Sequence, residues 1–99
     1  MKIDVTDIGR TFGRQTRAYA EYRIFATLAR FSALVREAAV SLTPVATGHS
    51  VVCSVRVHFE HGVPVTVTAR GRHAYDAINR AAHRIGSTLN RHAHVNSPF

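Results

Sequence analysis

The chain has 99 residues, 45% of them hydrophobic, which suits one domain with a modest core and leaves little room for a second. Thirteen Lys and Arg residues against six Asp and Glu residues give a formal net charge of +7, an imbalance that indicates a polyanionic partner. The single cysteine excludes an internal disulfide, and no apolar run is long enough for a membrane span, so we expect a cytoplasmic protein without a membrane partner.

Six elements are predicted from hydrophobic periodicity and turn residues. In chain order they are a strand at 2–6, a helix at 14–31, strands at 34–42, 51–60 and 63–70, and a helix at 75–91. Turns are expected at 7–12, at 47–49 after Pro44, at His61 and Gly62, and at Gly71. This β-α-β-β-β-α order predicts an α+β fold in which a four-stranded sheet carries both helices on one face. We expect one domain over residues 1–92 and a flexible tail over residues 93–99.

The first predicted helix has two apolar stripes on roughly opposite sides. One stripe consists of Ala20, Ile24, Leu28 and Phe31. The other consists of Ala18, Tyr22, Phe25 and Ala29. One stripe must pack on the sheet. The other indicates either a helix buried more than halfway round or a partner surface in which Tyr22 and Phe25 make the contact.

The second predicted helix separates apolar from basic residues. Its apolar stripe consists of Tyr75, Ile78, Ala82, Ile85 and Leu89, with Tyr75 expected to anchor the helix in the core. The opposite side carries Arg80, Arg84, Ser87 and Arg91. With no acidic residue expected to neutralise them, these arginines form a positive row suited to a phosphate backbone.

Arginines of the first helix are expected to extend this row. They are Arg17, Arg23 and Arg30, and a groove between the two helices would then accommodate a phosphate backbone. Lys2 is the only lysine of the chain. Because guanidinium groups pair with phosphate and stack on exposed bases, the excess of arginine favours RNA.

Local sequence in the second half of the chain resembles one known family. Residues 65–71 (VTVTARG), residues 75–79 (YDAIN) and the following Arg84, Leu89, Arg91 and His92 look like the last strand, glycine turn and helix of the ribosome hibernation-promoting factors. These proteins are also called ribosome-associated inhibitors or the sigma-54 modulation family. The first predicted helix is similar to theirs at Arg17, Tyr19, Arg23, Ile24 and Phe31. The resemblance runs from Lys2 to about His92 and fits the short form, without the extra C-terminal domain of long members.

Members of this family share the β-α-β-β-β-α fold, which is similar to double-stranded RNA-binding domains. They bind the small ribosomal subunit in the channel used by messenger and transfer RNA. The resemblance therefore implies a stress or stationary-phase protein that blocks translation, with the small subunit and its rRNA as partners. A second copy of the chain or a second hibernation factor is a further expected partner.

The same resemblance implies which residues bind RNA. Arg17, Arg23, Arg84 and Arg91 match basic positions of the family, whereas Arg80 is included because helical geometry places it in the same row. Two positions depart from the family pattern. Asn79 stands where many members have an aspartate, and Gly86 interrupts the helix at a cost of about 1 kcal/mol relative to Ala.

Catalytic and metal chemistry are not indicated by the remaining residues. The histidine pairs His58/His61 and His92/His94 lack the spacing of a helical zinc site, so we expect no metal and no cofactor. Cys53 alternates with core valines and is expected to be buried. His83 and His94 lie near the arginine row. We therefore predict no enzyme, and keep two alternatives to ribosome binding: a stand-alone module for double-stranded RNA, and a basic homo-oligomeric structural protein.

Overall fold

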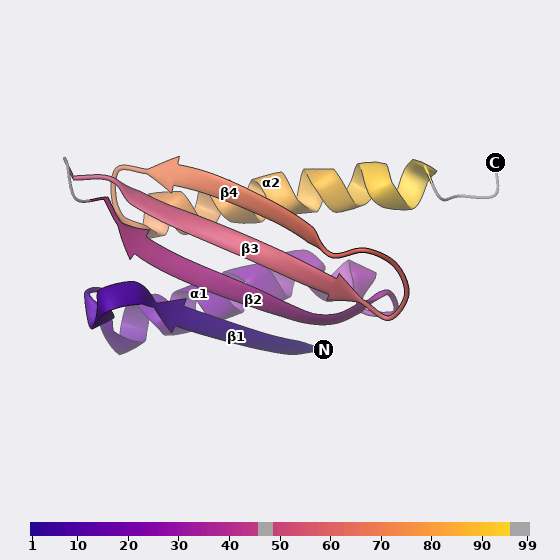
Figure 1. Cartoon of the computed structure of the whole chain (residues 1–99), viewed down its shortest axis with the longest axis horizontal. Helices are drawn as coiled ribbons and strands as arrows, with labels where there is room; N and C mark the ends of the chain where they lie inside the picture. The colour runs from indigo at the N-terminus through magenta and orange to yellow at the C-terminus, as the bar shows by residue number, and fades with distance from the viewer. Residues whose placement is uncertain (46–48, 96–99) are drawn as a thin grey trace.

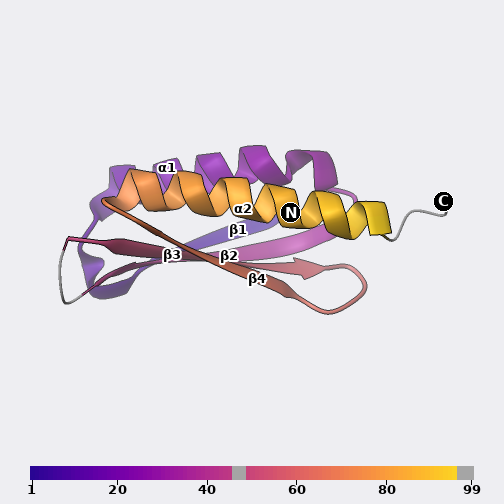
Figure 2. The same cartoon turned by 90° about the horizontal axis from the view of Figure 1, so that it is seen from above.

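The computed structural model describes residues 1–45 and 49–95, the last four of them by their backbone alone. Strands β1 (Lys2–Asp7), β2 (Val35–Pro44), β3 (Val51–Phe59) and β4 (Val65–Gly71) form one sheet. Helices α1 (Gly13–Leu28) and α2 (Ala74–Val95) lie side by side on one face of it (Figures 1 and 2). Short 3-10 turns, η1 (Ile8–Arg10) and η2 (Ala29–Phe31), flank α1. The predicted α+β fold and element order are confirmed.

The four strands lie in the order β1-β2-β3-β4, with β1 parallel to β2 and the other neighbours antiparallel. A parallel pair needs a crossover, which α1 supplies. Pairing places Val5 beside Val40, Val40 beside Val55 and Val55 beside Val67, so a row of valines crosses the sheet under the helices. The hydrophobic alternation of each strand therefore fixes the register, because a slip by one residue would turn this row outward.

Within residues 1–45 and 49–95, no helix covers the other face of the sheet (Figure 2). A row of hydroxyl residues crosses it in the same register: Thr6, Ser41, Ser54 and Thr68. Ser54 and Thr68 share a hydrogen bond with 2.9 Å between their oxygens. Small polar side chains thus suit this face to water.

Only one of the two apolar stripes on α1 is buried. Ile24 and Leu28 are fully buried in the core, whereas Tyr22 is 69% and Phe25 is 49% exposed. The idea of a helix buried more than halfway round is therefore wrong, because the sheet and α2 cover only one side of α1. Whether Tyr22 and Phe25 contact a second copy or another factor stays a prediction.

The Asp7 carboxylate organises the start of α1. It accepts hydrogen bonds from the backbone N–H groups of Thr11, Phe12 and Gly13, at 3.0, 2.8 and 3.0 Å. Desolvation opposes ionisation of this carboxyl, but the three donors and the nearby Arg17 bring the pKa of Asp7 below its ordinary value. A cap from outside the helix thus replaces the capping box that the sequence lacks.

Several element ends differ from the predicted ones. β4 begins at Val65 rather than at Val63, whose side chain is 80% exposed in the loop at 60–64. Pro64 explains the difference, since proline has no N–H to donate to a strand partner. β2 continues to Pro44, and α2 continues to Val95, beyond the predicted end at Arg91. Thr47 and Gly48 of the predicted turn, and residues 96–99 of the predicted tail, lie outside the described residues.

Candidate nucleic-acid interface

Gly71 places the start of α2 directly against the end of β4. A Cβ atom at this position would lie 2.3 Å from the backbone nitrogen of Ala77 and 2.8 Å from its Cα. These are backbone atoms of the first turns of α2, so no side-chain rotation could make room. The glycine therefore allows the close approach that sets α2 alongside the edge strand β4.

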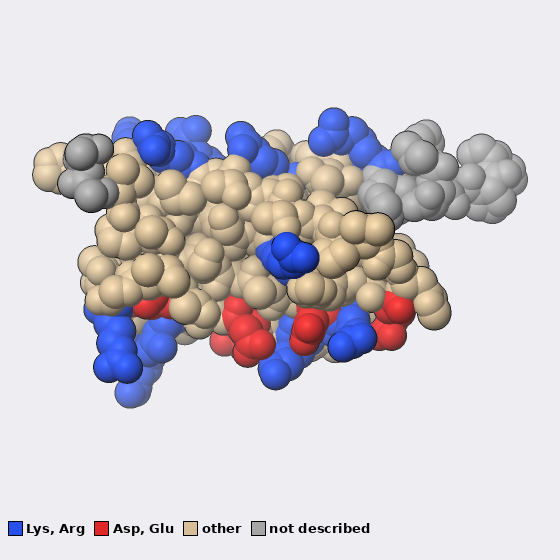
Figure 3. All heavy atoms as spheres, in the orientation of Figure 1, with Lys and Arg blue, Asp and Glu red and all other residues tan. Residues whose placement is uncertain are grey.

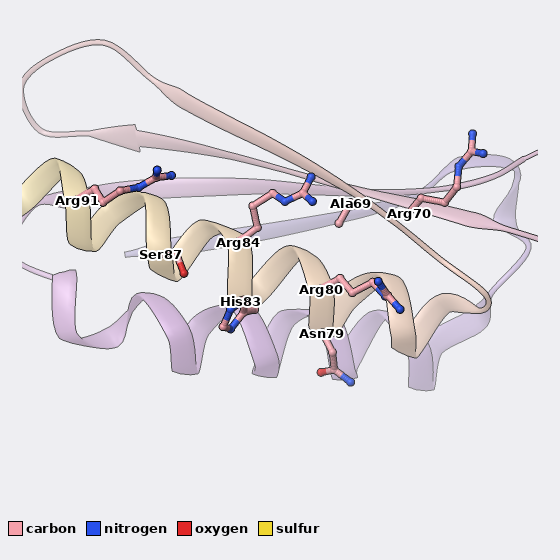
Figure 4. A pocket seen from close by; sticks show the side chains of 8 residues that line it. All are labelled: Ala69, Arg70, Asn79, Arg80, His83, Arg84, Ser87 and Arg91. Carbon is pink, nitrogen blue, oxygen red and sulfur yellow. The ribbon is translucent and has the colours of Figure 1, made fainter.

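A groove of about 520 Å³, here called the strand groove, lies between α2 and β4 (Figure 4). Its lining consists of Ala69, Arg70, Asn79, Arg80, His83, Arg84, Ser87 and Arg91. The structure thus brings together the predicted row of Arg80, Arg84 and Arg91. Sequence reasoning missed Arg70, which joins them from β4. Its signal was its place on the polar side of the strand, next to the Gly71 turn.

Arg84 links the helix to the sheet edge. Its guanidinium donates a hydrogen bond to the main-chain carbonyl of Thr68 on β4. Because β4 is an edge strand, its outward carbonyls have no strand partner, and Arg84 satisfies one of them. The remaining guanidinium N–H groups stay available to a ligand, since the Arg84 side chain is exposed.

The expectation that no acidic residue neutralises the row is wrong for Arg80. Its Nε lies 3.1 Å from Oδ1 of Asp76, and Arg72 pairs with the same carboxylate at 3.6 Å. The N–H of Arg72 and the side chain of Arg80 donate to Asp76 and hold its pKa below the ordinary value. Among the residues described by the structure, neither Arg84 nor Arg91 forms an ion pair. These two arginines therefore carry the uncompensated charge of the row.

A second groove, of about 460 Å³, lies between the two helices and is here called the helix groove. Its lining consists of Arg23, Ala26, Thr27, Arg30, Ala82, His83, Gly86, Ser87 and Asn90. The groove predicted between the helices is thus present. Gly86 has a structural reason, because a Cβ there would lie 3.2 Å from the Thr27 methyl on α1. The helices approach most easily where one of them lacks a side chain.

Arg23 is held in the helix groove by hydrogen bonds. Its Nε donates to Oδ1 of Asn79 at 3.2 Å, and its NH1 group donates to Oγ1 of Thr27 at 2.8 Å. The Tyr19 hydroxyl donates to the same Asn79 oxygen at 2.7 Å. Arg23 is therefore half-buried and fixed between the helices, and its partner Asn79 carries no charge to neutralise it.

Tyr75 is not the core anchor predicted for α2. Its side chain is 41% exposed, and its ring centroid lies 4.7 Å from that of Tyr19 at an interplanar angle of 56°. The two rings pack against each other at the surface between the helices. The core contacts of α2 come instead from its fully buried residues: Ala77, Ile78, Ala81, Ala82 and Ile85.

Arg17 does not extend the row. It lines hollows on the β1 side of α1, where Asp7 and Arg10 border one hollow and Asp4 and Glu21 border the other. Six residues at about 100° each place Arg17 roughly a third of a turn away from Arg23. The prediction that both belong to one surface is therefore wrong, while RNA binding by Arg17 itself stays a prediction.

Charge is unevenly distributed between the two long edges of the molecule. In Figure 3 the upper edge, where α2 and β4 lie, carries Lys and Arg atoms without visible Asp or Glu. The lower edge, formed by β1 and α1, carries both signs. On the face seen in Figure 3, positive charge without visible acidic neighbours therefore gathers at the edge formed by α2 and β4.

Among the described residues, the Cys and His side chains considered as candidates for metal binding or catalysis do not cluster. Cys53 is fully buried, as predicted, and burial raises the pKa of its thiol to about 12. Within residues 1–45 and 49–95, no three His, Cys, Asp or Glu side chains lie close enough together to hold a metal ion. None of the described helices has the length and apolarity needed to cross a membrane. His83 lines both grooves, whereas the side chain of His94 lies outside the described part.

Residues 3–96 match the model of the family described as sigma 54 modulation protein / S30EA ribosomal protein. The chain belongs to this family. The resemblance seen in the sequence is thereby confirmed. The match to the S30EA family covers both helices and all four strands except Lys2, the first residue of β1.

Solved structures share the S30EA fold of this chain. A ribosomal subunit interface protein from Coxiella burnetii superimposes with a TM-score of 0.81 at 13% identity, covering 94% of this chain and 98% of its own. The N-terminal domain of Protein Y from Thermus thermophilus gives 0.76 at 24% identity, covering 92% and 98%. No curated protein sequence matches the chain significantly. At these identities the likeness supports the fold.

Proposed function

We propose that this S30EA-family protein binds the small ribosomal subunit and its rRNA through α2 and the edge of β4. There it blocks the channel used by messenger and transfer RNA and keeps ribosomes idle in stress or stationary phase. The observation that carries the proposal is the strand groove, which gathers Arg70, Arg84 and Arg91 along one edge of a chain with net charge +7. Guanidinium groups in such a groove suit a phosphate backbone.

In this proposal the protein acts by sterically occupying the channel of messenger and transfer RNA. It catalyses no reaction and uses no cofactor. Its place of action is the cytoplasm, where ribosomes translate. The family described as S30EA ribosomal protein supports a ribosomal partner, and so does the shared fold of a ribosomal subunit interface protein. Arg23 contributes charge from the helix groove, and Arg80 contributes through the guanidinium N–H groups that Asp76 does not engage.

Sedimentation with purified small subunits at two salt concentrations tests the proposal. We expect the protein to co-migrate with the subunits and to be released as salt rises, because counterion release drives phosphate binding. Replacing both Arg84 and Arg91 with Ala should weaken binding by about tenfold or more. The salt slope, that is the slope of log affinity against log salt concentration, should fall in magnitude by about two, because roughly two phosphate contacts are lost.

The matched control is Arg56→Ala, which removes an exposed arginine from the uncovered face of the sheet. This variant should bind as the wild type does. Wild-type binding that survives the loss of both Arg84 and Arg91 would contradict the site. Tight binding to a naked RNA duplex, with none to small subunits, would instead favour the stand-alone double-stranded RNA module.

A further inference from the structure

The two grooves lie on opposite flanks of one helix, α2. The strand groove separates α2 from β4, and the helix groove separates α2 from α1. Among the side chains that the structure describes, only His83 and Ser87 line both grooves, and both are exposed, so they form a crest between the grooves. Figure 4 shows Arg84 and Arg91 reaching toward the strands, whereas Asn79 reaches toward α1.

Each flank of the crest carries its own arginines. Arg70, Arg84 and Arg91 line the strand groove, and Arg23 and Arg30 line the helix groove. Neither groove has an Asp or Glu among its described lining residues, unlike the hollows around Arg17, which include Asp7, Asp4 and Glu21. Each groove is therefore electrostatically suited to an anion through its own arginines, without a contribution from the other groove.

The two grooves lie too far apart for one RNA strand that follows one groove to contact the arginines of both. An α-helix with its side chains is about 10–12 Å wide, so the two grooves are separated by roughly that distance. Arg84 and Arg91 span about 10 Å along the axis of α2, and Arg23 and Arg30 span about the same along α1 and the turn η2 that follows it. A phosphate backbone running along one groove would leave the arginines of the other groove facing water.

We propose that the helix groove is a second phosphate-binding site, so that α2 inserts between two backbone segments of RNA. One segment follows the strand groove, and the other follows the helix groove. The crest then faces the sugars, where the imidazole of His83 and the hydroxyl of Ser87 can hydrogen-bond to 2′-hydroxyl groups. This inference rests on the proposed function and adds to it the number and placement of the RNA strands.

Substitutions that each replace one arginine with a neutral glutamine test the two grooves separately. Arg30→Gln removes a charge from the helix groove, together with the guanidinium whose Cζ lies 5.1 Å from the centroid of the Phe31 ring. Arg91→Gln removes a charge from the strand groove, and Arg56→Gln is the matched control on the uncovered sheet face. The readout is the affinity for small subunits over a series of salt concentrations.

We expect Arg30→Gln and Arg91→Gln each to weaken binding roughly threefold to tenfold and to lower the salt slope by about one. The double variant should lower the slope by about two, and the control should leave it unchanged. If Arg30→Gln matches the control while Arg91→Gln weakens binding, the helix groove is not a phosphate site and the inference is overturned. If the wild type itself does not bind, it is the proposed function that fails.

Crosslinking tests whether the two grooves hold different strands. A photoreactive group can be attached through Arg30→Cys or Arg91→Cys, because the native Cys53 is fully buried. The two positions should crosslink to rRNA segments that lie on opposite strands or far apart in sequence. Crosslinks from both positions to one contiguous segment would mean that a single strand crosses the helix, and would overturn the inference.

Discussion

At the scale of single residues, Asn79 joins the two helices without adding charge. Its Oδ1 accepts hydrogen bonds from Tyr19 and from Arg23, both on α1. A carboxylate at this position could accept the same two bonds but would neutralise Arg23. The amide therefore fixes the guanidinium in the helix groove while leaving its positive charge for a ligand.

We predict that Asn79→Asp weakens binding to small subunits without unfolding the protein. The new carboxylate should lower the salt slope by about one and the affinity by several-fold, because it pairs with Arg23. The free energy of unfolding should change by less than about 1 kcal/mol, since both hydrogen bonds persist. Affinity across a salt series and urea denaturation measure the two quantities.

The companion variant Asn79→Ala separates charge from hydrogen bonding. It removes the acceptor for Tyr19 and Arg23 and should cost about 1–2 kcal/mol of stability. The salt slope of Asn79→Ala should differ less from the wild-type value than the salt slope of Asn79→Asp does. An aspartate variant that binds as tightly as the wild type at every salt concentration would refute the role given to the amide.

At the scale of elements, the interface depends on how closely α2 approaches β4. Arg70 comes from the strand and Arg84 and Arg91 come from the helix, so the strand groove exists only while the two elements keep this spacing. Gly71 sets the spacing, because its missing side chain lets the backbone around Ala77 come close. Arg84 then bonds to the Thr68 carbonyl and ties the helix to the sheet edge.

We predict that Gly71→Ala destabilises the protein by about 2–3 kcal/mol, because the added methyl group would meet backbone atoms that cannot rotate away. Gly86→Ala is the matched control. Its methyl group meets only the ends of side chains, Thr27 at 3.2 Å and Arg30 at 4.0 Å, and a gain in helix propensity of about 1 kcal/mol offsets these contacts. Urea denaturation midpoints compare the two variants, and equal stability of both would show that the contact at Gly71 is unimportant.

At the scale of the whole molecule, two carboxylates tie the loops before the helices to the helix starts. Asp7 accepts three backbone N–H groups before α1, and Asp76 accepts the N–H of Arg72 and the side chain of Arg80. Both have a pKa below the ordinary value of 3.8. The folded state thus favours the ionised forms, so their contribution is complete above that value and is lost as pH falls through the lower folded pKa.

We predict that stability declines with acidification below about pH 4 and that the Asp7→Asn, Asp76→Asn double variant declines less. At neutral pH the wild type should be the more stable of the two, and the difference should shrink as pH is lowered. Thermal unfolding between pH 7 and pH 3 measures it. A constant difference over this range would show that the two carboxylates do not contribute to folding through their charge.

The fold could be predicted from the sequence because each element carries its own periodic signal. Buried residues occupy every second position of β3 from Val51 to Val57, and Ile78, Ile85 and Leu89 recur at helical spacing and are buried. The predictions from hydrophobic periodicity were wrong where a single residue or its position in the element overrides the periodic pattern. Val63 continues the alternation of β4, yet Pro64 keeps it out of the strand, and Tyr75 continues the apolar stripe of α2, yet it lies at the exposed start of the helix.

The α+β order, the net positive charge and the arginine row on α2 can all be predicted from the sequence, because they depend on composition and on the periods of helices and strands. Which arginines act together depends on tertiary packing. This packing added Arg70 from β4, fixed Arg23 on Asn79, paired Arg80 with Asp76 and placed Arg17 on another side. The reason is that a groove is formed between elements, and the rotation and spacing of packed elements leave no periodic signal in the chain.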